Sequence, residues 1–348
     1  MTRRPTPKAA VVAAVGGLLI AVGTTAQAGW MFVLAAGVLG LVTSALLTPH
    51  RLAAATVMRS VPERVRVGET VPVEVSLKNA SAKRLPPARV EVRCPAFETT
   101  SLACEAVAPG ATATVEVARV ALRRGVFDGS EVTVSSSAPF GFVRSKKELA
   151  VASRVIVHPQ VVAVDDLPLP ETPAATADQA LAVARSGHGD VFAGVREYRP
   201  GDQRRLIHWR STARAGTLVV REQEEQAKSP VVLVVGSLPA EEPGDRVAAA
   251  AASVGLHALA AGRTVHCAGR GLFGDLVENA SELSVLDWAA ALEGSGFTAA
   301  DGVSAAHRSW GRRCAFVVFE SEPGSSRDAI ELALSHGSTV QLVRATAA

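Results

Sequence analysis

The sequence predicts a membrane helical hairpin, then a β-sandwich of immunoglobulin-like size, then a doubly wound α/β domain. Three observations carry this prediction: an N-terminal region without charged residues, a series of short alternating strands, and apolar strands that alternate with helices. A chain of 348 residues is long enough for more than one domain, and 48% hydrophobic residues suffice for sizeable cores.

Two apolar runs near the N-terminus predict the membrane hairpin. No Asp, Glu, Lys or Arg lies between Lys8 and Arg51. The runs cover about residues 9–23 and 29–47, and each approaches the roughly 20 residues that span a bilayer as a helix. Basic residues flank both outer ends, namely Arg3, Arg4 and Lys8 before the pair and Arg51, Arg59, Arg64 and Arg66 after it. This pattern predicts a multi-pass protein of the inner (plasma) membrane with both termini in the cytoplasm.

A second interpretation treats the first run as a signal peptide. Ala26-Gln27-Ala28 has the small residues of a cleavage site, and the second run would then halt translocation. The remaining chain is cytoplasmic in either case. The uncleaved hairpin is favoured because the second run follows with almost no spacer. The oligomeric state stays open, since small residues such as Gly16, Gly17, Gly37 and Gly40 allow such helices to associate.

The region 59–159 predicts the β-sandwich. Short segments alternate between apolar and polar residues with the period of half-buried strands, and turn residues such as Gly68-Glu69 and Asp128-Gly129 separate them. The predicted strands are Val65–Val67, Val71–Leu77, Arg89–Arg93, Thr112–Val120, Ser130–Ser135 and Arg154–Val157. Residues 1–58 hold the tail and the two membrane segments, and the Pro-containing stretch 160–190 is predicted as a linker.

Region 226–348 predicts the α/β domain, because continuous apolar strands alternate with helices. The predicted strands are Pro230–Val235, Thr264–Ala268, Cys314–Phe319 and Thr339–Val343, and the predicted helices are Asp245–Ala261, Ser281–Leu292 and Ser326–Ser335. The short polar connection between Thr217–Arg221 and Pro230–Val235 predicts a hairpin.

Charge and cysteine content exclude several classes of site. The net charge of +3 and the lack of basic blocks argue against a nucleic-acid partner. The four cysteines, Cys94, Cys104, Cys267 and Cys314, are scattered, without metal-binding spacing, and are predicted to be buried thiols. No cofactor or metal is expected.

Residues 191–225 form the most distinctive segment, which we call the Arg–aromatic segment. It holds seven Arg, five acids, one His, one Trp and the chain's only Tyr. Asp202 is the predicted N-cap of a helix that places Leu206, Trp209 and Ala213 on one stripe, and Gly216 is its predicted end. Arg forks and amphipathic aromatic rings are side chains that bind carboxylates, phosphates or protein partners.

The order of parts and the pattern REYxPGDxxRxIHWRxxARxGxLxVRE resemble a bacterial family known as domain of unknown function fifty-eight. The residues that we expect in its motif and partner-binding site are Arg196, Glu197, Tyr198, Pro200, Gly201, Asp202, Arg205, His208, Trp209, Arg210, Arg214, Arg221 and Glu222. The resemblance implies a von Willebrand factor A-like C-terminal domain. It also implies protein partners, among them a MoxR-type AAA+ ATPase, in envelope-related or complex-assembly work.

Two positions depart from the family pattern. Gln203 stands where a second acid is usual. Gly236-Ser237-Leu238-Pro239-Ala240 replaces the Asp-x-Ser-x-Ser metal site that many members carry after the first α/β strand. Divalent metals need several oxygen ligands, which Gly, Leu and Ala side chains lack, so no adhesion-type metal site is expected.

Three functions of the Arg–aromatic segment compete. Its Arg and acidic side chains could pair internally and hold parts of the chain together. Alternatively, Tyr198, Trp209 and exposed Arg side chains form a docking surface for a protein. An enzymatic alternative uses His208 as base, Asp202 to orient it and an Arg cluster of Arg205, Arg210 and Arg214 to hold an anionic substrate. No nucleophile motif or P-loop accompanies that set. The sequence therefore favours a non-enzymatic, membrane-anchored scaffold or adaptor.

Overall fold

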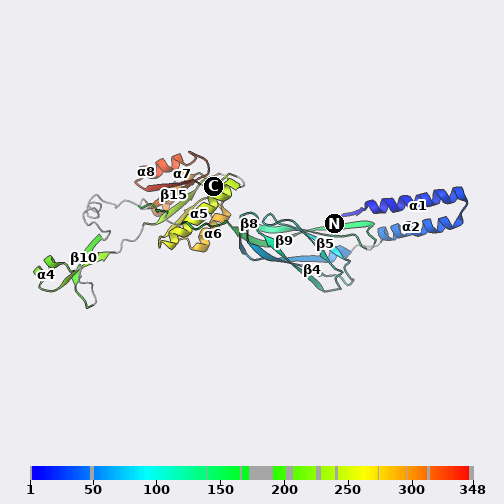
Figure 1. The fold of residues 1–348 in the computed structure, drawn as a ribbon, viewed down its shortest axis with the longest axis horizontal. Helices are drawn as coiled ribbons and strands as arrows, with labels where there is room; N and C mark the ends of the chain where they lie inside the picture. The colour runs from blue at the N-terminus through cyan, green and yellow to red at the C-terminus, as the bar shows by residue number, and fades with distance from the viewer. Residues whose placement is uncertain are drawn as a thin grey trace. The chain divides into compact units, whose positions relative to one another are not determined.

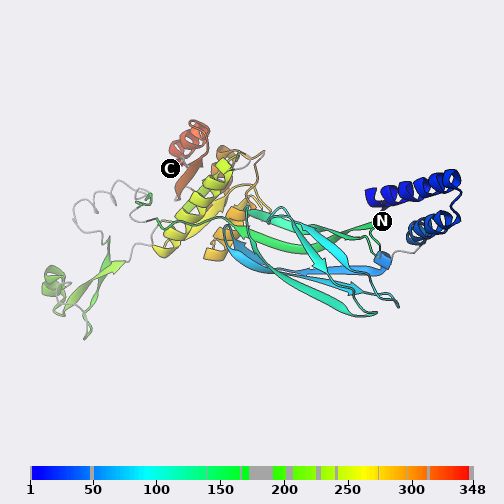
Figure 2. The same cartoon turned by 45° about the vertical axis from the view of Figure 1, so that its right-hand side comes forward.

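The computed structural model divides into two compact units, Met1–Gln160 and Val161–Ala348 (Figures 1 and 2). The structure describes residues 2–47, 51–138, 140–164, 167–171, 191–200, 207–224, 229–239, 242–272, 274–294, 296–311 and 314–344; at 51, 191–196 and 221–224 it describes the backbone alone.

Two antiparallel apolar helices, α1 (Pro7–Ala26) and α2 (Gly29–Leu47), lie side by side in the first unit (Figure 1). Both are long and apolar enough to cross a membrane, as the sequence predicts. They approach closely at Gly16, where a Cβ atom would lie 2.7 Å from Leu39 Cδ2. Their outer faces expose large apolar side chains such as Leu18 at 63% and Val33 at 73%.

The N-terminal tail is a strand rather than a free extension. β1 (Thr2–Pro5) pairs antiparallel with the start of β9 (Val143–His158), and Thr2 lies opposite Lys146 in this register. The sequence Thr-Arg-Arg-Pro has no apolar alternation, so the segment carried no local signal for a strand.

The β-sandwich consists of two sheets around one apolar core. One sheet has the order β1-β9-β8-β5-β6, with β3 also paired to β9, and the other has the order β2-β4-β7. The further strands are β2 (Ala55–Ser60), β3 (Arg64–Arg66), β4 (Thr70–Asn79), β5 (Ala88–Arg93), β6 (Thr100–Cys104), β7 (Thr112–Val120) and β8 (Gly125–Ser136). Alternate residues of β4 are buried in the core, which is the predicted period of two.

Every predicted sandwich strand is present, but the structure adds β2 and β6 and changes one turn. Asp128-Gly129, predicted as a turn between strands, lies inside β8 as a β-bulge, where the register with β9 shifts between Asp128 and Ser130. Gly129 has a φ of 115°, which accommodates the bulge without a strand break.

The α/β unit contains a five-stranded sheet of order β14-β13-β12-β15-β16, in which only the edge strand β14 runs antiparallel. Its strands are β12 (Val231–Val235), β13 (Val265–Ala268), β14 (Leu276–Val277), β15 (Ala315–Glu320) and β16 (Thr339–Arg344). Its helices are α5 (Glu242–Ala260), α6 (Glu282–Ala291), α7 (Ala299–Trp310) and α8 (Arg327–Ser335). α5 and α6 cover one face and α7 and α8 cover the other (Figures 1 and 2), so the predicted doubly wound layering is present.

The predicted hairpin between Thr217–Arg221 and Pro230–Val235 is wrong. β12 is the central strand, flanked by parallel β13 and β15, and all five of its residues are buried. A strand that helices cover on both faces has a continuous apolar sequence. Such a sequence does not indicate which strands pair with it, because those partners lie far away in the chain. Helix α7 was also missing from the prediction.

Part of the predicted linker belongs to the α/β unit. Val161, Leu167 and Leu169 pack against the core that α5 and α6 cover. The backbone N–H of Val162 donates to Ser253 Oγ at 3.1 Å, and Arg263 Nη2 donates to the Pro170 carbonyl at 3.1 Å. The α/β unit therefore begins at Val161, and the predicted linker residues 172–190 lie outside the described part of the chain.

All four cysteines are buried free thiols, as predicted. Burial raises the pKa of the Cys104 and Cys314 thiols, and it raises the pKa of Cys267 strongly. Thiols held in the neutral form are poor nucleophiles and poor metal ligands.

Candidate functional site

The Arg–aromatic segment folds as a two-stranded ribbon that carries a short helix. β10 (Val191–Glu197) pairs antiparallel with β11 (Val219–Glu224), and α4 (Trp209–Ala215) lies between them in sequence. The backbone N–H of Tyr198 donates to the Leu218 carbonyl at 2.8 Å, and Ile207 forms an isolated bridge with Val220. These bonds hold α4 against the end of the ribbon.

His208 begins the helix. Its Nδ1 accepts the backbone N–H of Ser211 at 3.3 Å and lies 2.7 Å from Ser211 Oγ. Its own N–H donates to the Val219 carbonyl at 2.8 Å, so the residue joins α4 to β11. His208 is therefore the N-cap of α4, although His is not among the preferred N-cap residues, and the predicted N-cap Asp202 lies outside the described residues.

The end of α4 is as predicted. Gly216 adopts a φ of 71°, and its N–H donates to the Thr212 carbonyl. Thr212 Oγ1 accepts the backbone N–H of Val219 at 3.0 Å, which ties the helix end to β11. A left-handed C-cap is the usual place for glycine.

No side chain of α4 is buried in a hydrophobic core. Trp209 is 68% exposed, and Arg210 and Arg214 are exposed on the same short helix. The neighbouring Leu218 is 43% exposed and was not predicted as a site residue, whereas Val219 and Val220 are buried. The structure thus exposes an aromatic side chain and two guanidinium groups on α4, and an apolar side chain, Leu218, just before β11.

The other predicted site residues divide into two groups. Glu197 and Pro200 are exposed and Tyr198 is half-buried at the end of β10. Gly201, Asp202 and Arg205, and the side chains of Arg196, Arg221 and Glu222, lie outside the described residues.

The carboxyl ends of β12 and β15 form the topological switch point of the α/β sheet, where ligands commonly bind in such folds. Gly236 follows β12, and a Cβ there would lie 2.9 Å from the backbone nitrogen of Ala299 at the start of α7. Ser237 Oγ donates to the Gly294 carbonyl at 2.8 Å. Gly236 and Ser237 therefore pack against the start of α7 and against Gly294.

Two carboxylates among the described residues near this edge, Asp301 and Glu320, form hydrogen bonds within the protein. Asp301 accepts hydrogen bonds from Thr298 N and Oγ1 at 2.9 and 2.7 Å, and these bonds lower its pKa. Burial works to raise the pKa of Glu320, but hydrogen bonds from Arg344 and from the Ser326 N–H outweigh it and lower the pKa. Within the described residues, no three His, Cys, Asp or Glu side chains gather as a metal-ion cluster.

A family model described as "Protein of unknown function DUF58" matches residues 194–273. The predicted family resemblance is confirmed. The match begins in β10 and extends past β13, so it joins the Arg–aromatic segment to the first strands of the α/β sheet. No curated protein matches the chain in sequence.

Similar solved structures include the CARDB domain of the PF1109 protein from Pyrococcus furiosus in complex with di-metal ions. It is 16% identical, with a TM-score of 0.20, over 28% of this chain and 91% of that chain. The Pseudomonas fluorescens alkylpurine DNA glycosylase AlkC is 11% identical over 29% of this chain and 31% of its own, with a TM-score of 0.18. A β-glucosidase from Listeria innocua is 18% identical over 29% of this chain and 16% of its own, with a TM-score of 0.16. Likenesses of this size say nothing about function.

Proposed function

We propose that the protein is a membrane-anchored, cytoplasm-facing scaffold or adaptor whose Arg–aromatic segment docks protein partners. The observation that carries the proposal is the 68% exposure of Trp209 on a helix with no buried residue. A large aromatic side chain exposed beside Arg210 and Arg214 has the composition of an interface hot spot.

The exposure favours docking over the internal-structure alternative. If the segment served only to hold the chain together, Trp209 and the arginines of α4 would be expected to bury area or form ion pairs. Among the described residues of the segment, Ile207, His208, Thr212 and Val219 join the ribbon to α4 through backbone and capping bonds.

The capping role of His208 also bears on the enzymatic alternative. Its Nδ1 accepts the Ser211 N–H, so the side chain has a structural role as the N-cap of α4. A non-enzymatic function therefore needs fewer assumptions about the site.

The membrane anchor and its orientation belong to the same proposal. β1 and β2 precede and follow the two apolar helices, and both join the β-sandwich, so a hairpin that spans a bilayer leaves the N-terminus and the sandwich on one side. The basic residues at both outer ends favour the cytoplasm for that side. The family resemblance suggests a MoxR-type AAA+ ATPase as the partner and a von Willebrand factor A-like role for the α/β unit.

The test is cross-linking in intact cells, followed by purification of the tagged full-length chain and identification of the proteins that co-purify. We expect Trp209→Ala and Arg210→Ala to lose an AAA+ ATPase that the wild type recovers. Their melting temperatures should stay unchanged, because exposed positions contribute within about 0.5 kcal/mol. Leu334→Ala and Arg308→Ala, at exposed positions on α8 and α7, serve as matched controls.

Two results would contradict this proposal. Equal recovery by wild type and folded variants would remove the docking function from the segment. A marked loss of stability and expression in both variants would instead assign Trp209 and Arg210 to internal structure.

A further inference from the structure

We infer that the membrane-side end of the β-sandwich lies within the bilayer interface, with Phe140 inserted at headgroup depth and Arg4 and Arg144 in contact with anionic lipid. This inference rests on the proposed membrane anchoring of α1 and α2. It adds a lipid-binding surface on the β-sandwich itself, formed by the β8–β9 turn and the pair of strands β1 and β9.

The depth of the β8–β9 turn is set by bonds to the first turn of α1. The backbone N–H of Thr6, the N-cap of α1, donates to the Phe142 carbonyl at 2.8 Å, and Thr6 Oγ1 donates to the Gly141 carbonyl at 2.6 Å. At the neighbouring helix end, Arg3 Nη2 donates to the Leu46 carbonyl at 2.8 Å. The turn is therefore fastened to the ends of the helices rather than held apart by a linker.

The length of α1 leaves little room for the turn to lie in bulk water. Its 20 residues extend for about 30 Å, which is the hydrocarbon thickness of a typical bilayer. A helix that must use its whole length to span places its first residue at the boundary between hydrocarbon and headgroups. The carbonyl groups of Gly141 and Phe142, bonded to Thr6, then lie at the same boundary.

The side chains at this depth have the composition of an interfacial anchor. Phe140 is 49% exposed, and its ring centroid lies 6.1 Å from that of the half-buried Phe142. Exposing half a phenylalanine to water is unfavourable, whereas the membrane interface accommodates aromatic rings.

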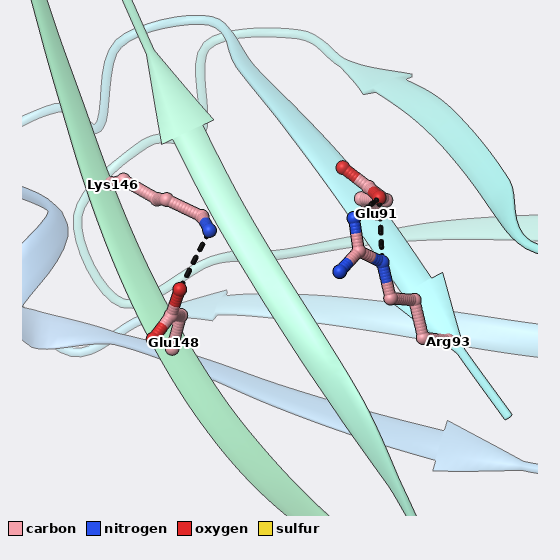
Figure 3. Close-up of polar contacts among 4 residues, drawn as sticks. All are labelled: Glu91, Arg93, Lys146 and Glu148. Carbon is pink, nitrogen blue, oxygen red and sulfur yellow. Dashed lines mark hydrogen bonds and ion pairs between the residues drawn. The ribbon is translucent and has the colours of Figure 1, made fainter.

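The charges next to the turn lack acidic partners. Arg4 of β1 and Arg144 of β9 are directly opposite in the antiparallel register, and both are exposed. Like charges in such a pair repel each other, and the ion pairs among the described residues include neither of them. The nearby Glu148 pairs with Lys146 at 2.6 Å instead (Figure 3). An anion between the two guanidinium groups relieves their repulsion, and Lys8 adds a third exposed positive charge at the start of α1.

The experiment for depth uses the full-length chain with a single environment-sensitive label on an introduced cysteine. The variants are Phe140→Cys, Leu18→Cys on the outer face of α1, and Leu122→Cys at the opposite end of β8, about 40 Å from the turn. The native cysteines are buried, and the labelled parent chain measures their background. The proteins are reconstituted in vesicles of phosphatidylcholine and phosphatidylglycerol with a nitroxide quencher on the lipid.

We expect the labels at 140 and 18 to be quenched and the label at 122 to stay bright. Quenching at 18 without quenching at 140 would overturn the interfacial position while leaving the membrane anchor in place. Absence of quenching at 18 would overturn the anchor, and with it this inference.

A second experiment tests the anionic lipid. Phosphatidylglycerol should raise the melting temperature of the wild-type chain in vesicles, and the Arg4→Gln, Arg144→Gln double variant should lose most of this increase. Arg93→Gln is the matched control, because Arg93 lies on β5 and pairs with Glu91 at 2.6 Å (Figure 3). An equal response of the wild type and the double variant to phosphatidylglycerol would overturn the headgroup contact.

Discussion

His266 shows how a single side chain links folding of the α/β unit to pH. It lies on β13, and its Nδ1 accepts the backbone N–H of Asn279 at 3.1 Å, so this nitrogen is unprotonated in the folded chain. The ring stacks on Trp310 with centroids 4.3 Å apart. Burial lowers the pKa of His266, and the charge of Glu278 opposes the shift only in part.

We predict that the α/β unit loses stability as the pH falls below the ordinary histidine pKa of 6.5, because the unfolded chain then binds a proton that the folded chain excludes. His266→Phe keeps a ring against Trp310 but removes the titrating group. The urea midpoint of His266→Phe, followed by tryptophan fluorescence, should depend less on pH between about pH 7 and about pH 5.5 than that of the wild type. An unchanged pH dependence in His266→Phe would assign the effect to another group.

Glu320 adds a separate loss of stability of the α/β unit below its ordinary pKa of 4.5, because its pKa is lowered in the folded chain.

At the scale of elements, the strand β1 decides how the membrane helices join the β-sandwich. β9 starts at Val143, and β1 covers its edge over four residue pairs from Val143 to Lys146. β8 pairs with the other edge of β9 from Ser145 to Val157, and β3 pairs with its far end. β1 therefore protects one defined segment of β9.

Deletion of residues 2–5 should expose that segment without unfolding the rest of the sandwich. We expect amide hydrogen exchange of residues 143–147 to become about 10–100-fold faster, since the loss of such edge pairing costs about 1–3 kcal/mol locally. A peptide from residues 150–157 is the internal control, because β1 does not pair with that part of β9. Equal exchange of residues 143–147 in both chains would contradict the pairing.

At the scale of the whole molecule, the pairing of β1 with β9 restricts the membrane topology. A span by α1 and α2 puts residue 2 and the sandwich on one side and the turn at Gln27 on the other. The uncleaved hairpin is required for this arrangement, because cleavage after Ala28 would remove both β1 and α1.

We predict that a membrane-impermeant maleimide added to the cytoplasmic face labels Thr2→Cys and Leu122→Cys, and that Ala26→Cys is labelled from the opposite face alone. The mature chain should keep residue 2, as shown by the mass of its N-terminal peptide. Labelling of positions 2 and 122 from opposite faces would be incompatible with the β1–β9 pair.

The sequence by itself determined the class of each part and the family resemblance. Absence of charge between Lys8 and Arg51 predicted the two helices, and a period of two predicted strands such as β4 and β7. Continuous apolar runs predicted β12 and β15, because these strands are buried on both faces. These features are local: each depends on which face of a segment avoids water.

Tertiary structure alone decided which strands pair and which site residues are exposed. β1 has no apolar pattern and exists because β9 offers it an edge; β11 pairs with β10 rather than with the next strand, β12. His208 caps α4, and Trp209 is exposed because α4 is held by its ends and by backbone bonds rather than by a buried stripe. Pairing and exposure depend on contacts between residues distant in sequence, which hydrophobic periodicity does not encode.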